Sequence, residues 1–224
     1  AKIYVSQSLS FAVLFIPTRH VLKEFTVTAK DLIHRLHPVY HYITGAGLDN
    51  CISIKSAKVN NQAFDFSGEA PELVPDSIAQ VALTMEPVGC AAELRTASDL
   101  HTCVANVLTF LQGLHGAGFC HRDIRIDNVI RCGRVYRVID LELADFSGQR
   151  VFWESDALSE RVKRTGTYVF EDDLWQLGSL IEARLARIVD EPAQGRLDSL
   201  RALATYLKGE GASTSEALVR IGVI

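Results

Sequence analysis

Long apolar runs are missing from this sequence of 224 residues, and so is a large excess of charge of either sign. A membrane-spanning helix needs roughly 18 consecutive apolar residues, and no run approaches that length, so we expect no membrane contact. Lys and Arg number 23 against 27 Asp and Glu, a formal net charge of −4. This balance argues against nucleic acid as a partner.

Cysteine pairs with the spacing of metal ligands are also absent. The five cysteines include no Cys-x-x-Cys pair, and their number is odd. This is typical of free thiols in a reducing intracellular compartment, either cytoplasm or nucleus. The sequence starts at Ala1 without a signal-peptide pattern, so we expect a processed or, more plausibly, a truncated chain.

Apolar residues make up 48% of the sequence, enough to bury a core as one large domain or two small lobes. Residues 1–5 read as a strand, whereas residues 11–16 stay open between helix and strand. Apolar residues three or four apart predict a helix over residues 21–36, which Pro38 ends. Residues 51–59 and 78–85 are predicted strands.

The second half is predicted to be mostly helical. Apolar residues recur at helical spacing after Asp99 and again after Asp173, so we expect each of these aspartates to cap a helix. Between the two helices, residues 128–131 and 135–139 predict a small hairpin. Two further helices are expected near the C-terminus. The whole pattern predicts an α+β fold.

Residues able to carry chemistry gather between these two helices. Asp123 is expected in a loop, Asn128 at the mouth of the hairpin, and Asp140 at the end of the return strand. One carboxylate that accepts a hydroxyl proton, with an amide oxygen and a second carboxylate that hold magnesium, is the minimum set for phosphoryl transfer.

The run His121-Arg122-Asp123-x-x-x-x-Asn128, followed by Ile139-Asp140, resembles the catalytic loop and metal-binding strand of the protein-kinase-like superfamily. Other segments resemble its hinge, its activation segment, its central helix and its last helix, namely residues 84–89, 166–168, 173–178 and 214–218. The resemblance covers residues 84–224 well and residues 1–83 loosely. It implies two lobes: a small β-rich N-lobe, residues 1–85, lacking the glycine-rich strands, and a larger helical C-lobe, residues 86–224.

The resemblance implies a role for each matching residue of the loop. Asp123 is the expected catalytic base, and Arg125 supplies the positive charge near the transferred phosphate. Asn128 and Asp140 are the expected magnesium ligands. Arg122 is the expected anchor of the activation segment.

The resemblance also implies ATP as a cofactor beside Mg²⁺. In the hinge, the carbonyl of Glu86 and the N–H of Val88 are expected to hold the adenine edge, with Met85 as the gatekeeper. Lys2 is the candidate for the lysine that holds the α- and β-phosphates, and Glu24 is its candidate partner on the following helix.

Two alternatives remain open around this lysine. Register from the proline points to Thr28 instead of Glu24 as the helix partner of Lys2. A weaker phosphate-loop pattern is formed by residues 45–47 together with Lys55 or Lys58, but it leaves no segment of helical length before the hinge.

The sequence departs from the family pattern at the metal-binding strand. Asp140-Leu141-Glu142 replaces the usual Asp-Phe-Gly, a form reminiscent of aminoglycoside and choline phosphotransferases and of divergent kinase-like proteins in fungi and oomycetes. A nearby Asp-Phe-Ser-Gly, residues 145–148, lies too far from Asn128 for the metal role. The predicted function is therefore an ATP- and magnesium-dependent phosphotransferase, most simply a protein Ser/Thr kinase. The alternatives are a small-molecule phosphotransferase of the aminoglycoside type and a pseudokinase scaffold.

A group of histidines and a group of basic residues can each be interpreted either as a functional site or as ordinary solvent-exposed side chains. His34, His37 and His41 suggest a metal site, but we expect solvated loop histidines because the proline between them breaks the helical register. The basic residues 161–164, beside two threonines and Tyr168, are either a phosphorylation-responsive loop or an ordinary solvated one.

Overall fold

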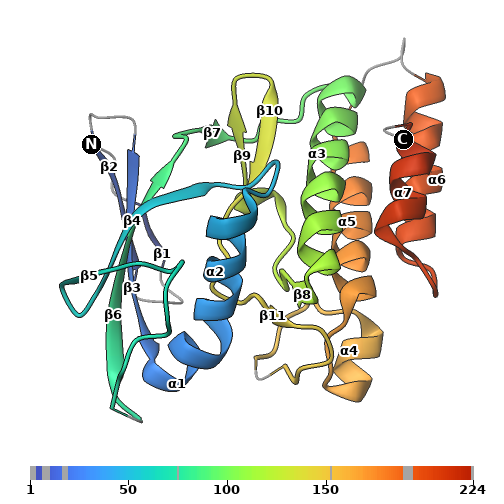
Figure 1. Ribbon diagram of the computed structural model, residues 1–224. Helices are drawn as coiled ribbons and strands as arrows, with labels where there is room; N and C mark the ends of the chain where they lie inside the picture. The colour runs from blue at the N-terminus through green and yellow to red at the C-terminus, as the bar shows by residue number, and fades with distance from the viewer. Residues whose placement is uncertain are drawn as a thin grey trace. The chain divides into compact units, whose positions relative to one another are not determined.

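The computed structural model describes residues 4–6, 11–16, 20–74, 76–151, 153–188 and 194–222. It divides into two compact units, which are described separately (Figure 1). The first unit comprises Ala1–Leu48 and Ile52–Gly89, and the second comprises Asp49–Cys51 and Cys90–Ile224. Both helices and antiparallel sheets are present, so the predicted α+β class is confirmed. Lys2 lies outside the described residues.

A six-stranded antiparallel sheet forms most of the first unit. Its strands are β1 (Tyr4–Ser6), β2 (Phe11–Ile16), β3 (His20–Thr28), β4 (Ser53–Val59), β5 (Gln62–Phe64) and β6 (Ile78–Glu86). They lie in the order β1-β2-β3-β6-β4-β5. The strands expected over residues 51–59 and 78–85 are confirmed, and the open segment 11–16 is a strand.

The helix predicted over residues 21–36 is wrong in its first half, which forms strand β3. Along β3, Lys23 and Phe25 are buried while Glu24 and Thr26 are exposed, an alternation with the period of two that defines a strand. Pairing with β2 on one side and β6 on the other stabilises this strand, and such tertiary pairing overrides the weak helical spacing of the apolar residues.

A helical segment follows β3 and runs past Pro38, so the expectation that this proline ends the helix is also wrong. The segment comprises α1 (Ala29–Asp31), the π-helical turn η1 (Leu32–Leu36) and α2 (His37–Ala46). Thr28 caps its start, because its Oγ1 accepts a hydrogen bond from the N–H of Asp31 at 3.1 Å. Pro38 is tolerated because it lies in the first turn of α2, directly after the widened π turn.

Two strands precede β3 in the described part of the chain. β1 and β2 pair antiparallel, and β2 pairs in turn with β3. The first glycine of the sequence is Gly45, so this hairpin is built without glycine.

Helices dominate the second unit. They are α3 (Ala97–Gly116), α4 (Glu160–Thr165), α5 (Phe170–Leu185), α6 (Gln194–Leu207) and α7 (Thr214–Ile221). Two small antiparallel sheets accompany them, one of β7 (Cys90–Ala91), β9 (Val129–Cys132) and β10 (Val135–Val138), the other of β8 (Phe119–Cys120) and β11 (Asp145–Phe146). In Figure 1, α3, α5 and α6 run alongside one another, and α7 packs on α3 and α6. The predicted hairpin is confirmed as β9 and β10.

The core of this unit lies along α3. Its predicted apolar stripe is confirmed, because Val104, Val107, Leu108, Leu111 and Leu114 are all fully buried. Burying each such side chain contributes about 1.5–3 kcal/mol to folding, so this one face supplies much of the stability of the unit.

The two predicted caps are displaced by a few residues. Thr96 caps α3 while Asp99 completes a capping box, the reciprocal hydrogen bonding of the two residues. Helix α5 begins at Phe170, so Asp173 is inside the helix, fully buried, and does not cap it. Among the described residues, no helix combines the length and apolar character needed to cross a membrane.

Candidate functional site

The loop between β8 and β9 brings together three of the predicted residues. Asn128 Nδ2 donates hydrogen bonds to Asp123 at its carboxylate Oδ2 (2.6 Å) and at its carbonyl oxygen (2.9 Å). Arg125 Nε lies 3.3 Å from the same Oδ2. The short 3-10 turn η2 (Ile126–Asn128) folds the chain back and sets these contacts, because Asn128 N–H bonds to the carbonyl of Arg125 at 3.0 Å.

The buried ring of His121 connects this loop to the residue that precedes Asp140. Its Nδ1 accepts the N–H of Asp123 at 3.2 Å, and its Nε2 donates to the carbonyl of Ile139 at 3.0 Å. A backbone N–H can only donate, so the proton of the ring is on Nε2. The N–H of Ile139 also bonds to the carbonyl of Asn128 at 2.9 Å, so the two expected metal ligands lie on backbone segments that are bonded to each other.

Two residues of the site have a strained backbone. Arg122 has φ of 71° and Asp140 has φ of 69°, in the left-handed region that residues other than glycine rarely adopt. Each such residue costs about 1–3 kcal/mol, which surrounding contacts must offset, and strained residues of this kind cluster at functional sites.

Asp173 anchors the loop, because its buried carboxylate accepts four hydrogen bonds. Its carboxylate accepts from the backbone N–H groups of His121 and Arg122, both at 2.8 Å, and from Tyr168 Oη and His115 Nε2, both at 2.9 Å. Burial alone raises the pKa of Asp173, but the hydrogen bonds from His115 and from the backbone of His121, with electrostatic attraction to both histidines, together outweigh it, so this pKa is lowered. The carboxylate is therefore the charged anchor of the loop.

Gln176, one helical turn further along α5, adds a second anchor. Its Oε1 accepts the N–H of Ile124 at 2.8 Å, and its Nε2 donates to the carbonyl of Arg122 at 3.2 Å. The sequence interpretation missed this role of Asp173 and Gln176. The signal for it was available, because two polar residues three positions apart interrupt the apolar face that carries Leu177 and Leu180.

The side chain of Arg122 is enclosed by residues that follow β10. Its Nη1 lies 3.1 Å from Asp145 Oδ2, and its Nη2 donates to the carbonyl of Phe146 at 3.3 Å. The rings of Trp153 and Tyr168 lie 5.9 Å and 5.8 Å from the guanidinium carbon. Arg122 thus anchors the segment after β10. Its ionic partner is Asp145, which lies too far along the sequence from Asn128 for the role of metal ligand.

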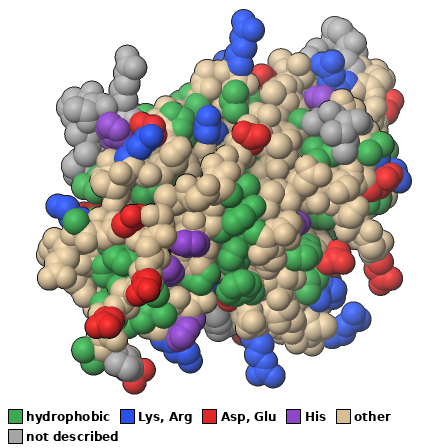
Figure 2. Space-filling model, in the orientation of Figure 1, with side chains coloured by type: hydrophobic (Ala, Val, Ile, Leu, Met, Phe, Trp, Pro, Cys, Tyr) green, Lys and Arg blue, Asp and Glu red, His purple; other side chains and the backbone are tan. Residues whose placement is uncertain are grey.

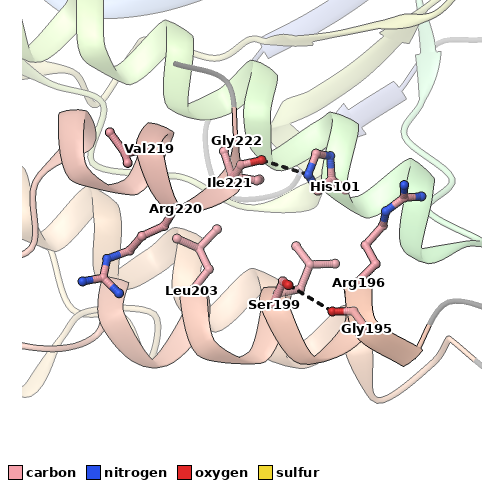
Figure 3. A pocket seen from close by; sticks show the side chains of 10 residues that line it. His101, Gly195, Arg196, Ser199, Leu203, Val219, Arg220, Ile221 and Gly222 are labelled. Atoms are coloured by element: carbon pink, nitrogen blue, oxygen red, sulfur yellow. Dashed lines mark hydrogen bonds between the residues drawn. The ribbon is translucent and has the colours of Figure 1, made fainter.

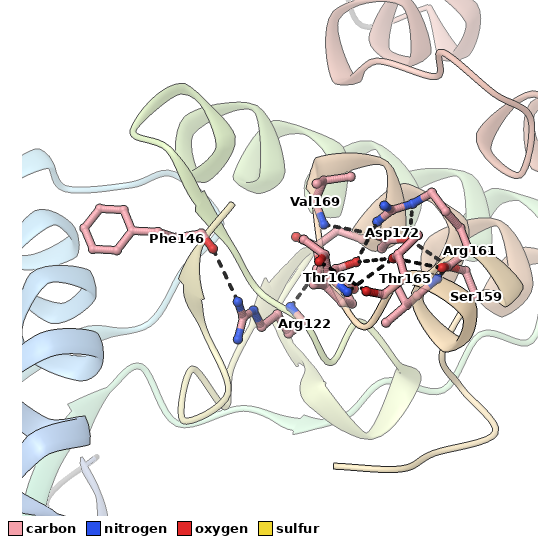
Figure 4. Close-up of polar contacts among 11 residues, drawn as sticks. Arg122, Phe146, Ser159, Arg161, Thr165, Thr167, Val169 and Asp172 are labelled. Atoms are coloured by element: carbon pink, nitrogen blue, oxygen red, sulfur yellow. Dashed lines mark hydrogen bonds and ion pairs between the residues drawn. The ribbon is translucent and has the colours of Figure 1, made fainter. Parts of the chain in front are cut away.

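Polar residues of α4, of the start of α5 and of the segment that joins these helices bind one another (Figure 4). Asp172 accepts hydrogen bonds from Ser159 Oγ at 2.7 Å and from the N–H of Val169 at 2.8 Å, and it forms an ion pair with Arg161. Arg161 also donates to the carbonyl of Thr167 at 3.1 Å. Among the basic residues 161–164, Arg161 therefore already forms its ionic and hydrogen-bond contacts with Asp172 and Thr167.

Tyr168 is fully buried at the end of this segment. Burial and the neighbouring Asp173 carboxylate raise its pKa well above the ordinary value, and its hydroxyl donates to that carboxylate. Its hydroxyl is thus inaccessible to a modifying enzyme in this fold.

The residues predicted to bind the nucleotide lie in the first unit. Met85 is buried and Val88 is exposed. Glu86 forms an ion pair with Lys55 and lies 3.5 Å from His20 Nε2, and the hydrogen bond from Lys55 lowers the pKa of Glu86.

Glu24 is wrong as a helix partner, because it is an exposed residue of strand β3. The lysine that the structure buries on β3 is Lys23, one residue before Glu24. The three histidines expected in a solvated loop lie on the helical segment, and His37 is buried.

Cavities among the described residues of the second unit include one beside α6 and one beside α4. One, of about 430 Å³, lies among α3, α6 and α7, where His101 from α3 and Leu203 from α6 face it (Figure 3). The other, of about 550 Å³, is lined by the segment before and within α4, including Val151, Trp153 and Leu158. Because Trp153 also contacts Arg122, this second cavity adjoins the enclosure of that arginine.

Acidic and basic side chains of the described residues are interspersed over the visible surface (Figure 2). The mixture agrees with the small net charge of the sequence.

No protein-family model matches the sequence. Over 110 residues, 46% of the chain, it is 33% identical to Crinkler effector protein 8 of Phytophthora infestans. The chain spans 18% of the length of that protein. This partial likeness assigns the chain to no family.

Proposed function

We propose that the chain is an ATP- and magnesium-dependent phosphotransferase with a kinase-like fold, whose acceptor is a Ser or Thr hydroxyl of a protein. The first unit is then the small lobe and the second unit the helical lobe. The observation that supports this most is the contact of Asp123 with Asn128, in a loop whose spacing matches the family motif. The name of the partial relative specifies no reaction, so the proposal depends on the site.

Asp123 is the base in this proposal. Both of its side-chain contacts, from Asn128 Nδ2 and Arg125 Nε, engage Oδ2. We therefore propose that Oδ1, the other carboxylate oxygen of Asp123, accepts the proton of the acceptor hydroxyl. The exposed guanidinium of Arg125 supplies positive charge for the transferred phosphoryl group.

Asn128 and Asp140 fit a magnesium ion by their chemistry, because Mg²⁺ prefers oxygen ligands. The Nδ2 of Asn128 is directed to Asp123, which assigns its Oδ1 to the metal. Asp140 follows Ile139, which is hydrogen-bonded to both His121 and Asn128. A bound magnesium ion supplies neutralisation of the phosphate charge.

Lys23 replaces Lys2 in the proposal as the lysine that holds the nucleotide phosphates. In protein kinases this lysine lies on a strand that leads into a helix. Lys23 is buried on β3, and β3 leads through Thr28 into the helical segment.

The test is phosphoryl transfer from radiolabelled ATP to a generic protein acceptor with Mg²⁺ present. Asp123→Asn and Asp140→Asn should each lower kcat by at least about 100-fold, since each removes a charge that acts in the transition state. Asp127→Asn is the matched control, an exposed residue of the same loop with the same change. Wild-type kcat in either of the first two variants would overturn the proposal.

A small-molecule acceptor is the second candidate, and the two carboxylates Asp140 and Glu142, in the segment that follows β10, favour it. Parallel assays with aminoglycosides and with choline, at equal enzyme concentration, separate the two acceptor classes. A higher kcat/KM for transfer to one of these molecules than to protein acceptors would make the small molecule the favoured acceptor.

The scaffold alternative predicts nucleotide binding without turnover. A thermal-shift experiment with ATP, in the presence and absence of Mg²⁺, tests it, because a ligand stabilises the state that binds it. An active enzyme should gain stability only with both present, whereas a scaffold should show little dependence on magnesium.

A further inference from the structure

The side chain of Arg122 is a permanent cation without access to solvent. Its side chain is 0% exposed, and a guanidinium keeps its proton in proteins. A charge removed from water in this way must be compensated by an opposite charge and by hydrogen bonds. The identity of that compensating charge therefore decides what holds Arg122 in place.

Asp145 provides this charge from a strand adjacent to the loop. β11 pairs antiparallel with β8, in register Asp145 to Cys120 and Phe146 to Phe119, and β8 leads directly into the loop. Asp145 Oδ2 lies 3.1 Å from Arg122 Nη1, and the carbonyl of Phe146 accepts from Nη2. Two aromatic rings cover the guanidinium at cation–π distance.

The backbone of Arg122 transmits this anchoring to Asp123. Arg122 has the strained φ of 71°, and its N–H and carbonyl are bonded to Asp173 and Gln176. A strained residue keeps its conformation only while its surroundings hold it. Loss of the side-chain anchor would leave only these two backbone hydrogen bonds to hold the strained peptide, and its relaxation would displace the adjacent carboxylate of Asp123.

We propose that Asp145 is a positioning residue for Asp123, and that this built-in carboxylate makes an added phosphate on residues 145–167 unnecessary for assembly of the catalytic loop. The inference rests on the proposed function for its kinetic consequences. It goes beyond that function because it states how the site is regulated: the catalytic loop assembles without an added phosphate. The enclosure of Arg122 by Asp145, Phe146 and the two rings supports it.

The kinetic test compares Asp145→Asn, Asp145→Glu and the control Glu160→Gln, which removes an exposed carboxylate from the same segment. Asp145→Asn should lower kcat at least 10-fold with KM for ATP within twofold, because the base is displaced while nucleotide contacts persist. Asp145→Glu should restore kcat to within threefold of the wild type. Wild-type kcat in Asp145→Asn, or an equal loss in Glu160→Gln, would contradict the positioning role.

Amide hydrogen exchange gives a readout that does not need activity. In Asp145→Asn, peptides covering residues 119–128 should exchange at least 10-fold faster, whereas those covering 214–222 should be unchanged. If the wild type transfers no phosphate, the proposed function fails, yet this exchange pattern still supports the structural half of the inference. Unchanged exchange in residues 119–128 overturns it.

If the single variant does not fold, the neutral pair Arg122→Gln with Asp145→Asn replaces it, since it leaves no buried charge. A low kcat with fast exchange of the loop supports the inference, and wild-type kcat in this double variant overturns it. Finally, phosphatase treatment of the wild type should change kcat by less than twofold. A loss of more than 10-fold on treatment would show that the loop depends on an added phosphate.

Discussion

The second unit buries a carboxylate among hydrogen-bond donors, whereas the first unit buries a histidine among aromatic rings. Asp173 accepts hydrogen bonds from four groups. His37 instead lies with its ring centroid 5.9 Å from each of the rings of His41, Phe64 and Phe66. Hydrogen-bond donors stabilise the charged form of a buried carboxylate, whereas burial favours the neutral form of an imidazole.

This difference gives the two units opposite responses to protons. Burial, with the nearby His41, lowers the pKa of His37, so the neutral form is favoured in the folded state. The hydrogen bonding of Asp173 lowers its pKa, so the charged form is favoured there. Protonation therefore weakens both units, but each in its own pH range.

The largest effect that this comparison predicts comes from Asp173→Ala. The substitution leaves donors of His121, Arg122 and Tyr168 buried without their acceptor, so it should lower the free energy of unfolding of the second unit by about 3–5 kcal/mol. Trp153 and Trp175 are the two tryptophans of the sequence and both belong to the second unit, so urea unfolding followed by tryptophan fluorescence reports this unit.

The control for this variant is Asp198→Ala on α6. Asp198 pairs with Arg201 at 2.7 Å, but both side chains are more than half exposed. Exposed pairs contribute about 0–1 kcal/mol, so the midpoint in urea should hardly move. Equal losses in the two variants would show that Asp173 is no special anchor.

The second prediction is an intermediate effect, the pH dependence of the first unit. Because the folded pKa of His37 lies below its unfolded value of about 6.5, the unfolded chain binds the proton first, and stability is lost as pH falls from about 7 through that value. The lowered pKa of Asp173 keeps this carboxylate charged to a lower pH than an ordinary aspartate. The protection factors of residues 37–46 against hydrogen exchange, corrected for the intrinsic rate at each pH, should therefore fall at a higher pH than that at which tryptophan fluorescence changes.

His37→Phe keeps a ring in the cluster and removes the titrating group. In this variant, the protection factors over residues 37–46, which compare each exchange rate with the intrinsic rate at the same pH, should depend little on pH between about 7 and 5. His34→Phe, a change at an exposed histidine of the same helical segment, is the matched control and should leave the pH dependence as in the wild type. If His37→Phe kept the pH dependence of the wild type, the burial of His37 would not be the cause of that dependence.

The sequence allowed more of the second unit to be predicted than of the first, for a physical reason. The contact of Asp123 with Asn128 depends on a fixed spacing within one short loop, and local spacing is visible in a sequence. The stripe on α3 is similarly local, since one helical face repeats at a regular interval.

The first unit depends on pairing between distant segments, which spacing does not report. Residues 21–28 are a strand because β2 and β6 flank them, and this is why Glu24 was misplaced on a helix. The role of Asp173 was missed for a similar reason, since three of its four donors come from residues 51 to 58 positions away. The strained φ of Asp140 likewise depends on tertiary contacts that no local pattern contains.

The smallest predicted effect concerns the exposed ion pair of Lys55 with Glu86 in the first unit. Lys55→Gln removes the hydrogen bond that lowers the pKa of Glu86, so this pKa should return toward its ordinary value. Because both side chains are more than a third exposed, solvent screens the pair, and the thermal midpoint should shift by no more than about 1 °C. Carboxyl titration by nuclear magnetic resonance and a thermal melt measure the two quantities on one sample. A large loss of stability with this variant would show that exposed charge also holds the first unit, and the contrast between the units would then concern only their buried groups.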